Sequence, residues 1–284
     1  MGLDYDTAWA RRYPARLARA ALVDFVSTPM TRVVAPATVL GADALERLEG
    51  PVVFAANHHS HFDTAVLLGA IPARLRHKLI VAAASDYFFD TTVKATVMSL
   101  VLGAIPIERT KVSRRSAQNA LELLEDGWSV LIYPEGGRSA DGWMQEFKGG
   151  AAYLSVRTGT PVVPIWLEGT GRILPKRPTE SGRTPGGSGS ESDRVTTLRR
   201  HPVSVTFGRP LRPAETDDAR GFGSKIEEAV ALLGREVASD YYTARRRPDR
   251  TLTHGPEGAA WRRAWARPPA ISVAERLPRD EWPR

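Results

Sequence analysis

Short apolar runs alternate with amphipathic segments along most of the chain. Apolar runs typical of buried strands occupy residues 52–56, 78–84, 104–109, 128–133, 161–169 and 203–211. Helical spacing of apolar residues predicts helices over 64–71, 91–102, 113–126, 147–158 and 226–242. Strands that alternate with helices indicate an α/β fold, and we predict a single domain with a mixed, largely parallel sheet flanked by helices.

Two local features carry expectations of their own. Residues 86–89 contain three aromatic residues after a strand, and we expect a loop with apolar anchors there. Pro164 lies inside the run 161–169, and proline cannot donate to a strand ladder. We therefore expect that strand to lie at a sheet edge or to contain a bulge.

The N-terminal segment is amphipathic. Trp9, Tyr13, Leu17 and Ala20 share one helical face, whereas Arg11, Arg12, Arg16 and Arg19 share the other. Pro14 either divides this stretch or starts a second helix. A basic amphipathic helix with aromatic residues suits a lipid interface, and the alternative is an ordinary surface helix docked on the domain. We favour the interface.

No apolar run is long enough to cross a bilayer. The longest, residues 95–107, has about 13 residues where a span needs about 20. The first residues also lack the pattern of a secretory signal. We expect a cytoplasmic protein that is peripheral on the inner face of the cell membrane.

Composition changes along the chain and suggests three regions. We predict a helical N-terminal region (1–40), a central domain (41–244) with a mobile Ser/Gly/Pro-rich loop at 176–200, and an Arg/Pro/Trp-rich tail (245–284). The 284 residues contain no cysteine, which excludes disulfides and thiol chemistry. A net charge of +7 favours anionic partners such as an anionic membrane surface. We expect no nucleic acid, because no nucleic-acid-binding motif accompanies the charge.

The main candidate for chemistry is the stretch Asn-His-His-Ser-His-Phe-Asp at 57–63, between a predicted strand and helix. On a continuous helix His58 and Asp63 would point about 140° apart. They meet only if His58 lies in the turn and Asp63 in the first helical turn. The pair would then be a general base and the carboxylate that orients it.

Two other interpretations of these residues remain open. Ser60 and Asp63 have the spacing of a capping box, in which the carboxylate accepts a hydrogen bond from the serine N–H. His59, His61 and Asp63 instead match the start of a His-x-His-x-Asp metal-binding pattern. That pattern predicts a metal-dependent hydrolase, although Thr64 stands where its last histidine should be.

Four blocks of the sequence occur in an order that carries a resemblance. They are Asn57, His58, Ser60 and Asp63; then Gly103, Ile107 and Arg109; then Tyr-Pro-Glu-Gly-Gly-Arg-Ser at 133–139; and finally Val-Val-Pro-Ile at 162–165. Together they resemble the glycerolipid acyltransferases typified by 1-acylglycerol-3-phosphate acyltransferase. One such match is weak, but four in order are specific.

The resemblance implies an α/β fold and transfer of a fatty acyl group to the free hydroxyl of a lysophospholipid. The acyl donor would be acyl-CoA or acyl carrier protein, with no metal and no other cofactor. His58 would deprotonate the hydroxyl and Asp63 would orient His58. The remaining implied site residues would bind or shape the substrate pocket: Asn57, Ser60, Arg109, Glu135, Gly136, Gly137, Arg138 and Lys148.

The chain departs from the family pattern at two places. Gly137 replaces the hydroxyl residue usual in the third block, which removes a side-chain donor. His59 and His61 are not required by the first block, and we expect them to line the pocket or face solvent. A non-catalytic protein that binds anionic lipid is a further alternative.

Overall fold

The structure is a computed structural model, and it describes residues 2–108, 114–139, 144–174 and 199–238. Within these residues seven strands form one sheet in the order β1-β7-β6-β2-β5-β3-β4. Their bounds are β1 Ala37–Leu40, β2 Val53–Ala56, β3 Leu79–Ala84, β4 Ala104–Ile107, β5 Ser129–Ile132, β6 Val162–Glu168 and β7 Val203–Phe207. The strands from β6 to β4 are parallel, and β7 is antiparallel to β6. The predicted mixed, largely parallel α/β sheet is confirmed.

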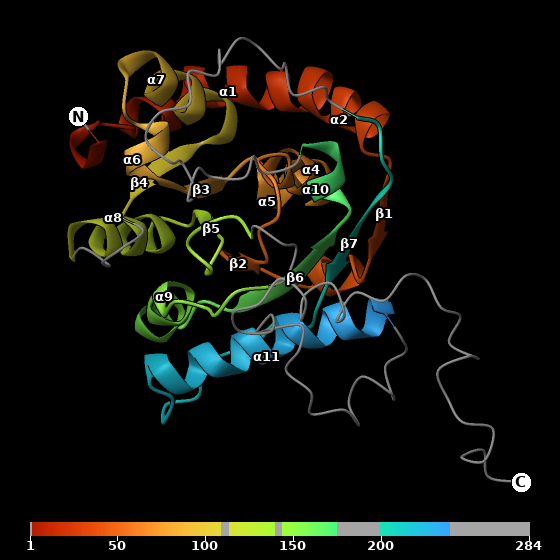
Figure 1. Cartoon of the computed structure of the whole chain (residues 1–284). Coiled ribbons are helices and arrows are strands. Elements are labelled where there is room, and N and C mark those ends of the chain that lie inside the picture. Colours follow the sequence, from red (N-terminus) through yellow and green to blue (C-terminus); the bar gives the residue numbers. More distant parts are fainter. Residues whose placement is uncertain (1, 109–113, 140–143, 175–198, 239–284) are drawn as a thin grey trace, which may run out of the picture.

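Helices cover both faces of this sheet (Figure 1). One layer contains α1 Tyr13–Leu22, the π-helical turn η3 Val23–Ser27, α2 Thr28–Val34, α4 Asp63–Ala70 and α7 Thr92–Leu102. The other layer contains α8 Arg114–Glu125, α9 Gly150–Thr158 and α11 Ala219–Ala238. Short helices connect these elements: η1 Gly2–Asp4, η2 Ala8–Arg11, α3 Asp43–Glu46, α5 Ala73–Arg76, α6 Ser85–Phe88 and α10 Thr170–Ile173.

The central strand β2 shows why two layers are needed. Its four residues are apolar and completely buried. Phe54 and Ala56 pack into the core beneath α4, whereas Val53 and Ala55 pack into the core beneath α8 and α9. A parallel strand buried on both faces is a continuous apolar run rather than an alternating one. This is the pattern at 52–56 in the sequence.

The parallel strands bring three segments of the chain to one edge of the sheet. Ala55 of β2 pairs with Ile132 of β5, so His58 and Tyr133 both follow the carboxyl ends of adjacent strands. The end of β3 leads into α6 beside them. In open α/β sheets the crevice outside the carboxyl ends of the strands is the usual ligand site.

The N-terminal helix has its polarity reversed relative to an ordinary surface helix. Pro14 lies in the first turn of α1, so it starts a second helix after η2 rather than dividing one helix. Tyr13 and Phe25 are 75% and 81% exposed, whereas Arg19 is 5% exposed. The apolar face therefore points away from the domain and part of the basic face points into it. The helix is docked on the domain through its basic face.

The buried Arg19 attaches α1 to the domain. Its guanidinium donates to the carbonyl oxygens of Leu79 and His77, at 3.1 Å each, and lies over the Trp128 ring. Burial lowers the pKa of Arg19 to about 10, so the group stays charged at neutral pH. Gly103 ends α7 with φ +66°, and a Cβ at this position would collide with the guanidinium. The glycine thus serves both the helix end and the arginine.

Three local expectations need correction. Residues 86–89 are not a loop, because α6 occupies Ser85–Phe88. Pro164 does not lie at a sheet edge, because β6 is an interior strand, but the bulge that was the other expectation is present. Ile165 pairs with Phe207 and Val162 bridges Leu211, so residues 163–164 of β6 lie opposite 208–210, with one extra residue on the second segment. Strand β1, which joins the sheet through β7, was not predicted at all. Its four residues are exposed, so the sequence there lacks the apolar pattern of a core strand.

Several other expectations fall outside the described residues. These are Arg109, nearly all of the loop 176–200, and the tail 245–284. Within the described part of the chain, no helix combines the length and hydropathy that a bilayer crossing requires.

Candidate active site

His58 and Asp63 form a hydrogen-bonded pair where the sequence placed them. His58 lies in the turn after β2, and Asp63 is the first residue of α4. His58 Nδ1 and Asp63 Oδ2 are 2.8 Å apart. The Asp63 side chain is fully buried, and the His58 side chain is 14% exposed. An acid that is inaccessible, paired with a histidine that is accessible, is the arrangement of a base and its orienting group.

Half of the capping interpretation is confirmed: the Asp63 carboxylate accepts from the Ser60 N–H, but α4 begins at Asp63 itself, with Phe62 as its N-cap and no side-chain cap from Ser60. The same atom, Oδ2, accepts hydrogen bonds from the backbone N–H groups of His59 (2.8 Å) and Ser60 (2.9 Å). One carboxylate oxygen therefore holds the turn and the imidazole together. The other oxygen, Oδ1, is buried without a hydrogen-bond partner among the described residues. The carboxylate bond to the Ser60 N–H and the bond that orients His58 therefore occur together in one structure.

The peptide groups of His58 are anchored to the segment that follows β5. Its N–H donates to Glu135 Oε1 at 2.7 Å, and its carbonyl oxygen accepts from the Ser139 N–H at 2.8 Å. Glu135 Oε2 accepts from the Gln145 N–H at 3.0 Å. The backbone that carries the imidazole is thus fixed on both sides. The sequence alone did not indicate this role for Glu135 or Ser139.

Asn57 and Ser60 are completely buried and bind backbone groups. The Asn57 amide donates to the carbonyl oxygen of Leu167 (2.9 Å) and accepts from its N–H (2.7 Å), which continues the pairing of β2 with β6 beyond Ala56. Ser60 Oγ donates to the carbonyl oxygen of Leu174 at 2.9 Å. Both residues shape the turn that presents His58. Their contact with substrate stays a prediction.

The glycine turn after β5 lies beside this pair. Gly136 has φ +71°, and a Cβ there would collide with the side chain of Lys148. A Cβ at Gly137 would meet open space, so the missing hydroxyl leaves room in the site. Arg138 lines the same cavity as His58, and Lys148 lines a smaller cavity next to it. Four of the predicted residues thus gather near His58, while the position of Arg109 is not described.

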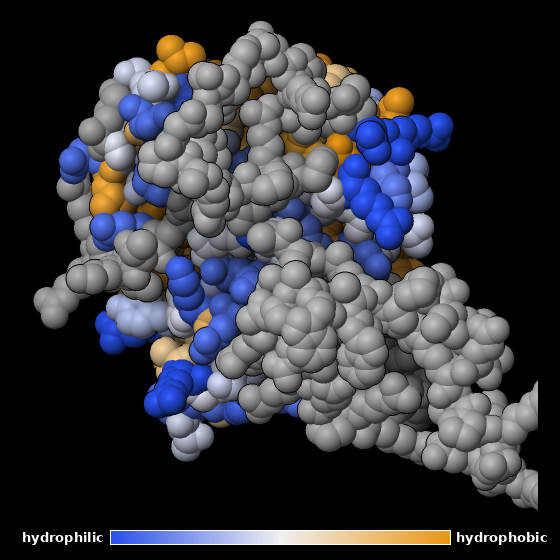
Figure 2. Space-filling view, in the orientation of Figure 1, coloured by the Kyte–Doolittle hydropathy of each residue, from blue (hydrophilic) through white to orange (hydrophobic). Residues whose placement is uncertain are grey.

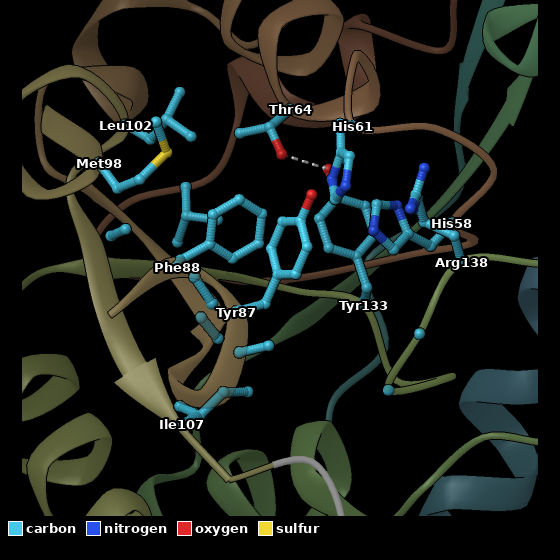
Figure 3. A pocket seen from close by; sticks show the side chains of 17 residues that line it. His58, His61, Thr64, Tyr87, Phe88, Met98, Leu102, Ile107, Tyr133 and Arg138 are labelled. Carbon is cyan, nitrogen blue, oxygen red and sulfur yellow. Dashed lines mark hydrogen bonds between the residues drawn. The ribbon is translucent and has the colours of Figure 1, made fainter. Parts of the chain in front are cut away.

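A largely apolar cavity of about 340 Å³ opens at His58. Its walls come from the end of β3, from Tyr87 and Phe88 of α6, and from Met98 and Leu102 of α7 (Figure 3). Gly136, Gly137 and Arg138 form its polar rim. A cavity with apolar walls and a few polar groups at one end suits an amphiphile whose polar end lies at His58.

His61 lines this cavity as a neutral group. Its ring stacks on Tyr87, with ring centroids 5.2 Å apart, and meets the edge of Phe88 at 5.5 Å. Burial, followed by the charges of Arg138 and His58, lowers the pKa of His61 to about 4. His61 Nε2 is buried without a hydrogen-bond partner among the described residues.

The alternative metal set does not converge in space. His59 lies beside Trp166 of β6, His61 lies beside Tyr87 of α6, and Asp63 Oδ2 is held by His58 and by two backbone N–H groups. Within the described ranges, no three His, Asp or Glu side chains are grouped as a metal site would require. Three donors on one side of an ion are the minimum for a catalytic zinc site.

Known proteins match this chain over the segment that contains the site. Positions 36–168 match a protein-family model described as "Acyltransferase". The chain is 34% identical over 201 residues to the chloroplastic 1-acyl-sn-glycerol-3-phosphate acyltransferase BAT2 of Brassica napus, which covers 69% of this chain and 51% of the relative. The chloroplastic 1-acyl-sn-glycerol-3-phosphate acyltransferase LPAT1 of Arabidopsis thaliana is 31% identical over 198 residues, which is 68% of this chain and 48% of the relative. The chain therefore spans about half the length of these relatives.

A solved structure agrees with the fold. The 1-acyl-sn-glycerophosphate (LPA) acyltransferase PlsC of Thermotoga maritima superposes with a TM-score of 0.57, over 84% of this chain and 85% of that one, at 21% identity. The family model spans the segment from β1 to β6 and contains His58, Asp63 and the glycine turn. On these sequence matches, residues 36–168 of this chain belong to the acyltransferase family.

Proposed function

We propose that this protein transfers a fatty acyl group from acyl-CoA or acyl carrier protein to the free hydroxyl of a lysophospholipid. The simplest acceptor is 1-acylglycerol-3-phosphate, which would give phosphatidic acid. The observation that carries the proposal is the His58–Asp63 pair, 2.8 Å apart, at the mouth of an apolar cavity. The names of the plant and bacterial relatives support the same acceptor.

His58 acts as the general base in this proposal. Asp63 accepts from Nδ1–H, which leaves the lone pair on Nε2 for the acceptor hydroxyl. Nε2 takes the hydroxyl proton as the oxygen attacks the thioester carbonyl carbon. The C–S bond then breaks, the imidazolium returns the proton to the departing thiolate, and the products are an ester and a free thiol. Asp63 stabilises the imidazolium between these two steps.

The glycine turn serves the charge that develops on the carbonyl oxygen. Gly136 and Gly137 let the backbone approach closely, and Arg138 brings a positive charge to the same rim. Lys148, which lies against Gly136, would bind the acceptor phosphate together with Arg109. The apolar cavity would hold an acyl chain.

The helix layer that contains α1, η3, α2 and α7, the N-terminal layer, would bring this enzyme into contact with lipid. Phe25, Val33 and Val93 are 81%, 67% and 74% exposed, and they come from η3, α2 and α7. Figure 2 shows hydrophobic patches along the upper rim of the molecule, over α7 and beside α2. We assign this outward apolar surface to the membrane, with the protein peripheral on the inner face of the cell membrane.

The decisive experiment offers purified protein a panel of acyl-CoA and acyl carrier protein donors with several lysophospholipids. Free thiol and lipid mass are measured, so that transfer is distinguished from hydrolysis. His58→Ala should lose at least about 10²-fold in kcat. His201→Ala is the matched control, because His201 lies on the approach to β7 and should leave kcat unchanged. Full turnover by His58→Ala would refute the assigned base.

Two other outcomes would replace the proposal. Loss of activity with a chelator and its recovery with zinc would favour the metal-dependent hydrolase. Salt-sensitive binding of anionic vesicles without any thiol release would favour a non-catalytic lipid-binding protein.

A further inference from the structure

The ring of Tyr133 lies flat against the imidazole of His58. The ring centroids are 4.1 Å apart and the planes differ by 20°, so this is a stacked pair (Figure 3). Tyr133 follows β5 and His58 follows β2, and the pairing of Ala55 with Ile132 sets the two residues beside each other. The contact therefore follows from the register of two core strands and not from a mobile loop.

The hydroxyl of Tyr133 is fixed as well. It shares a hydrogen bond of 3.0 Å with Thr64 Oγ1, which is the dashed line in Figure 3. Thr64 is the residue after Asp63 in α4, and it is buried. Burial, with the nearby charge of Asp63, raises the pKa of Tyr133 well above its ordinary value, so the phenol stays neutral. One turn of α4 thus holds the imidazole through Asp63 and holds the ring beneath it through Thr64.

The hydrogen bond from Nδ1 to Asp63 restricts rotation of the imidazole about its Cβ–Cγ bond, but the ring can still pivot by a small angle within the range of that hydrogen bond. A flat ring against one face removes the pivot and fixes the direction of the Nε2 lone pair. A proton acceptor must lie within hydrogen-bond reach and in line with the hydroxyl, and displacement by about 1 Å can cost about 10²-fold in rate.

We infer that Tyr133 is a positioning residue, which sets the plane of the His58 imidazole by stacking and is itself held by Thr64. This inference rests on the proposed acyl transfer by His58. The ring performs the positioning, and the hydroxyl adds a bond that fixes the tilt of the ring.

The kinetic test compares two substitutions. Tyr133→Leu removes the stacked ring, and kcat should fall about 10- to 100-fold with KM changed by less than about twofold. Tyr133→Phe keeps the ring, and kcat should stay within about threefold of the wild type. A structural role without positioning would instead lower the fraction of active enzyme, which active-site titration or the thermal midpoint reports.

A second measurement does not depend on turnover. A ring 4.1 Å away shifts the carbon-bound protons of His58 upfield in the NMR spectrum, and the signals are assigned by their loss in His58→Gln. The upfield shift should persist in Tyr133→Phe and vanish in Tyr133→Leu. Tyr87→Leu is the matched control, because Tyr87 stacks on His61 and should leave the His58 shift in place.

A double substitution tests the hydrogen bond. Thr64→Val and Tyr133→Phe each remove one partner of the same bond, so the double variant should be no slower than the slower single variant. Fully multiplicative losses would contradict the Thr64 part of the inference.

The outcomes separate this inference from the proposed function. A wild-type enzyme without acyl transfer overturns both. An active wild type whose Tyr133→Leu variant keeps its kcat, or whose His58 protons show no upfield shift, overturns the role of Tyr133 alone. Should Tyr133→Leu fail to fold, the wild-type and Tyr133→Phe spectra still decide whether the two rings stack.

Discussion

Glu135 binds the backbone N–H of His58. The carboxylate accepts the His58 N–H at 2.7 Å through Oε1 and the Gln145 N–H at 3.0 Å through Oε2. It is 7% exposed, so it joins two segments from inside the site. Its effect on the reaction should therefore pass through the position of His58.

We expect Glu135→Ala to lower kcat by about 10- to 100-fold and the free energy of unfolding by about 1–3 kcal/mol, because two inward N–H groups lose their acceptor. Glu135→Gln keeps one acceptor oxygen and should be intermediate in both. Steady-state kinetics and urea unfolding measure these effects. Glu146→Gln is the control, since Glu146 is an exposed carboxylate nearby. An unaffected Glu135→Ala would show that the anchor is dispensable.

Substitutions of Asp63 distinguish the effect of its charge on His58 from the effect of its hydrogen bonds. Asn can place its oxygen at the position of Oδ2, keep the bonds to His58, His59 and Ser60, and put its amide where Oδ1 has no partner. We expect Asp63→Asn to fold but to lose about 10²-fold or more in kcat, because the imidazolium loses its counter-charge. Asp63→Ala should also lose stability, by about 2–5 kcal/mol.

Circular dichroism melting and kinetics distinguish these two variants. Equal activity of wild type and Asp63→Asn would mean that geometry alone suffices at this position.

His61 predicts a pH dependence of stability. Its pKa is about 4 in the folded protein against an ordinary value of 6.5, so the unfolded chain binds more protons between these values. The free energy of unfolding should therefore fall as the pH drops from 6.5 towards 4, with no further fall from this group at lower pH. The fall should be between about 1 and 3 kcal/mol.

The measurement is urea unfolding of wild type and His61→Phe at about pH 7 and about pH 5. Phenylalanine keeps the contacts with Tyr87 and Phe88 but cannot take up a proton. The variant should lose less stability between the two pH values than the wild type. Identical losses would show that His61 titrates in the folded protein as it does in the unfolded chain.

The outward apolar surface predicts binding to vesicles. Phe25→Glu places a charge at the most exposed aromatic residue of the N-terminal layer, and we expect cosedimentation with anionic phospholipid vesicles to fall at least about tenfold. Ser224→Glu adds the same charge on α11, across the sheet, and should leave binding unchanged. Equal binding by the two variants would remove this surface from the proposed function.

The sequence predicted most core elements because their patterns are local. The apolar run of β2 and the helix end at Gly103 each carry their own signal. The pairing of His58 with Asp63 was also accessible, since five intervening peptide units restrict how the two side chains can meet. Strand β1 was missed because its residues are exposed, and strand patterns report burial rather than pairing.

Features that depend on the order of strands in the sheet could not be predicted from the sequence. The stacking of Tyr133 on His58 joins residues 75 positions apart, and no short pattern links them. The bonds of Glu135 and Ser139 to the His58 peptide depend on the same adjacency of β2 and β5. The amphipathic pattern of α1 revealed two faces but not which one turns inward, because buried Arg19 finds its acceptors at His77 and at Leu79, the first residue of β3.

The hydrogen bonds of Arg19 link α1 to the strand that lines the cavity beside His58. Its guanidinium grips the carbonyl of Leu79, the first residue of β3, and the last residues of that strand wall the cavity beside His58. If α1 makes the membrane contact proposed above, we expect a change in its tilt to be transmitted to this wall through β3. Binding to a lipid surface would then change the shape of the cavity beside His58. The kcat for soluble short-chain substrates should therefore change when empty vesicles are added.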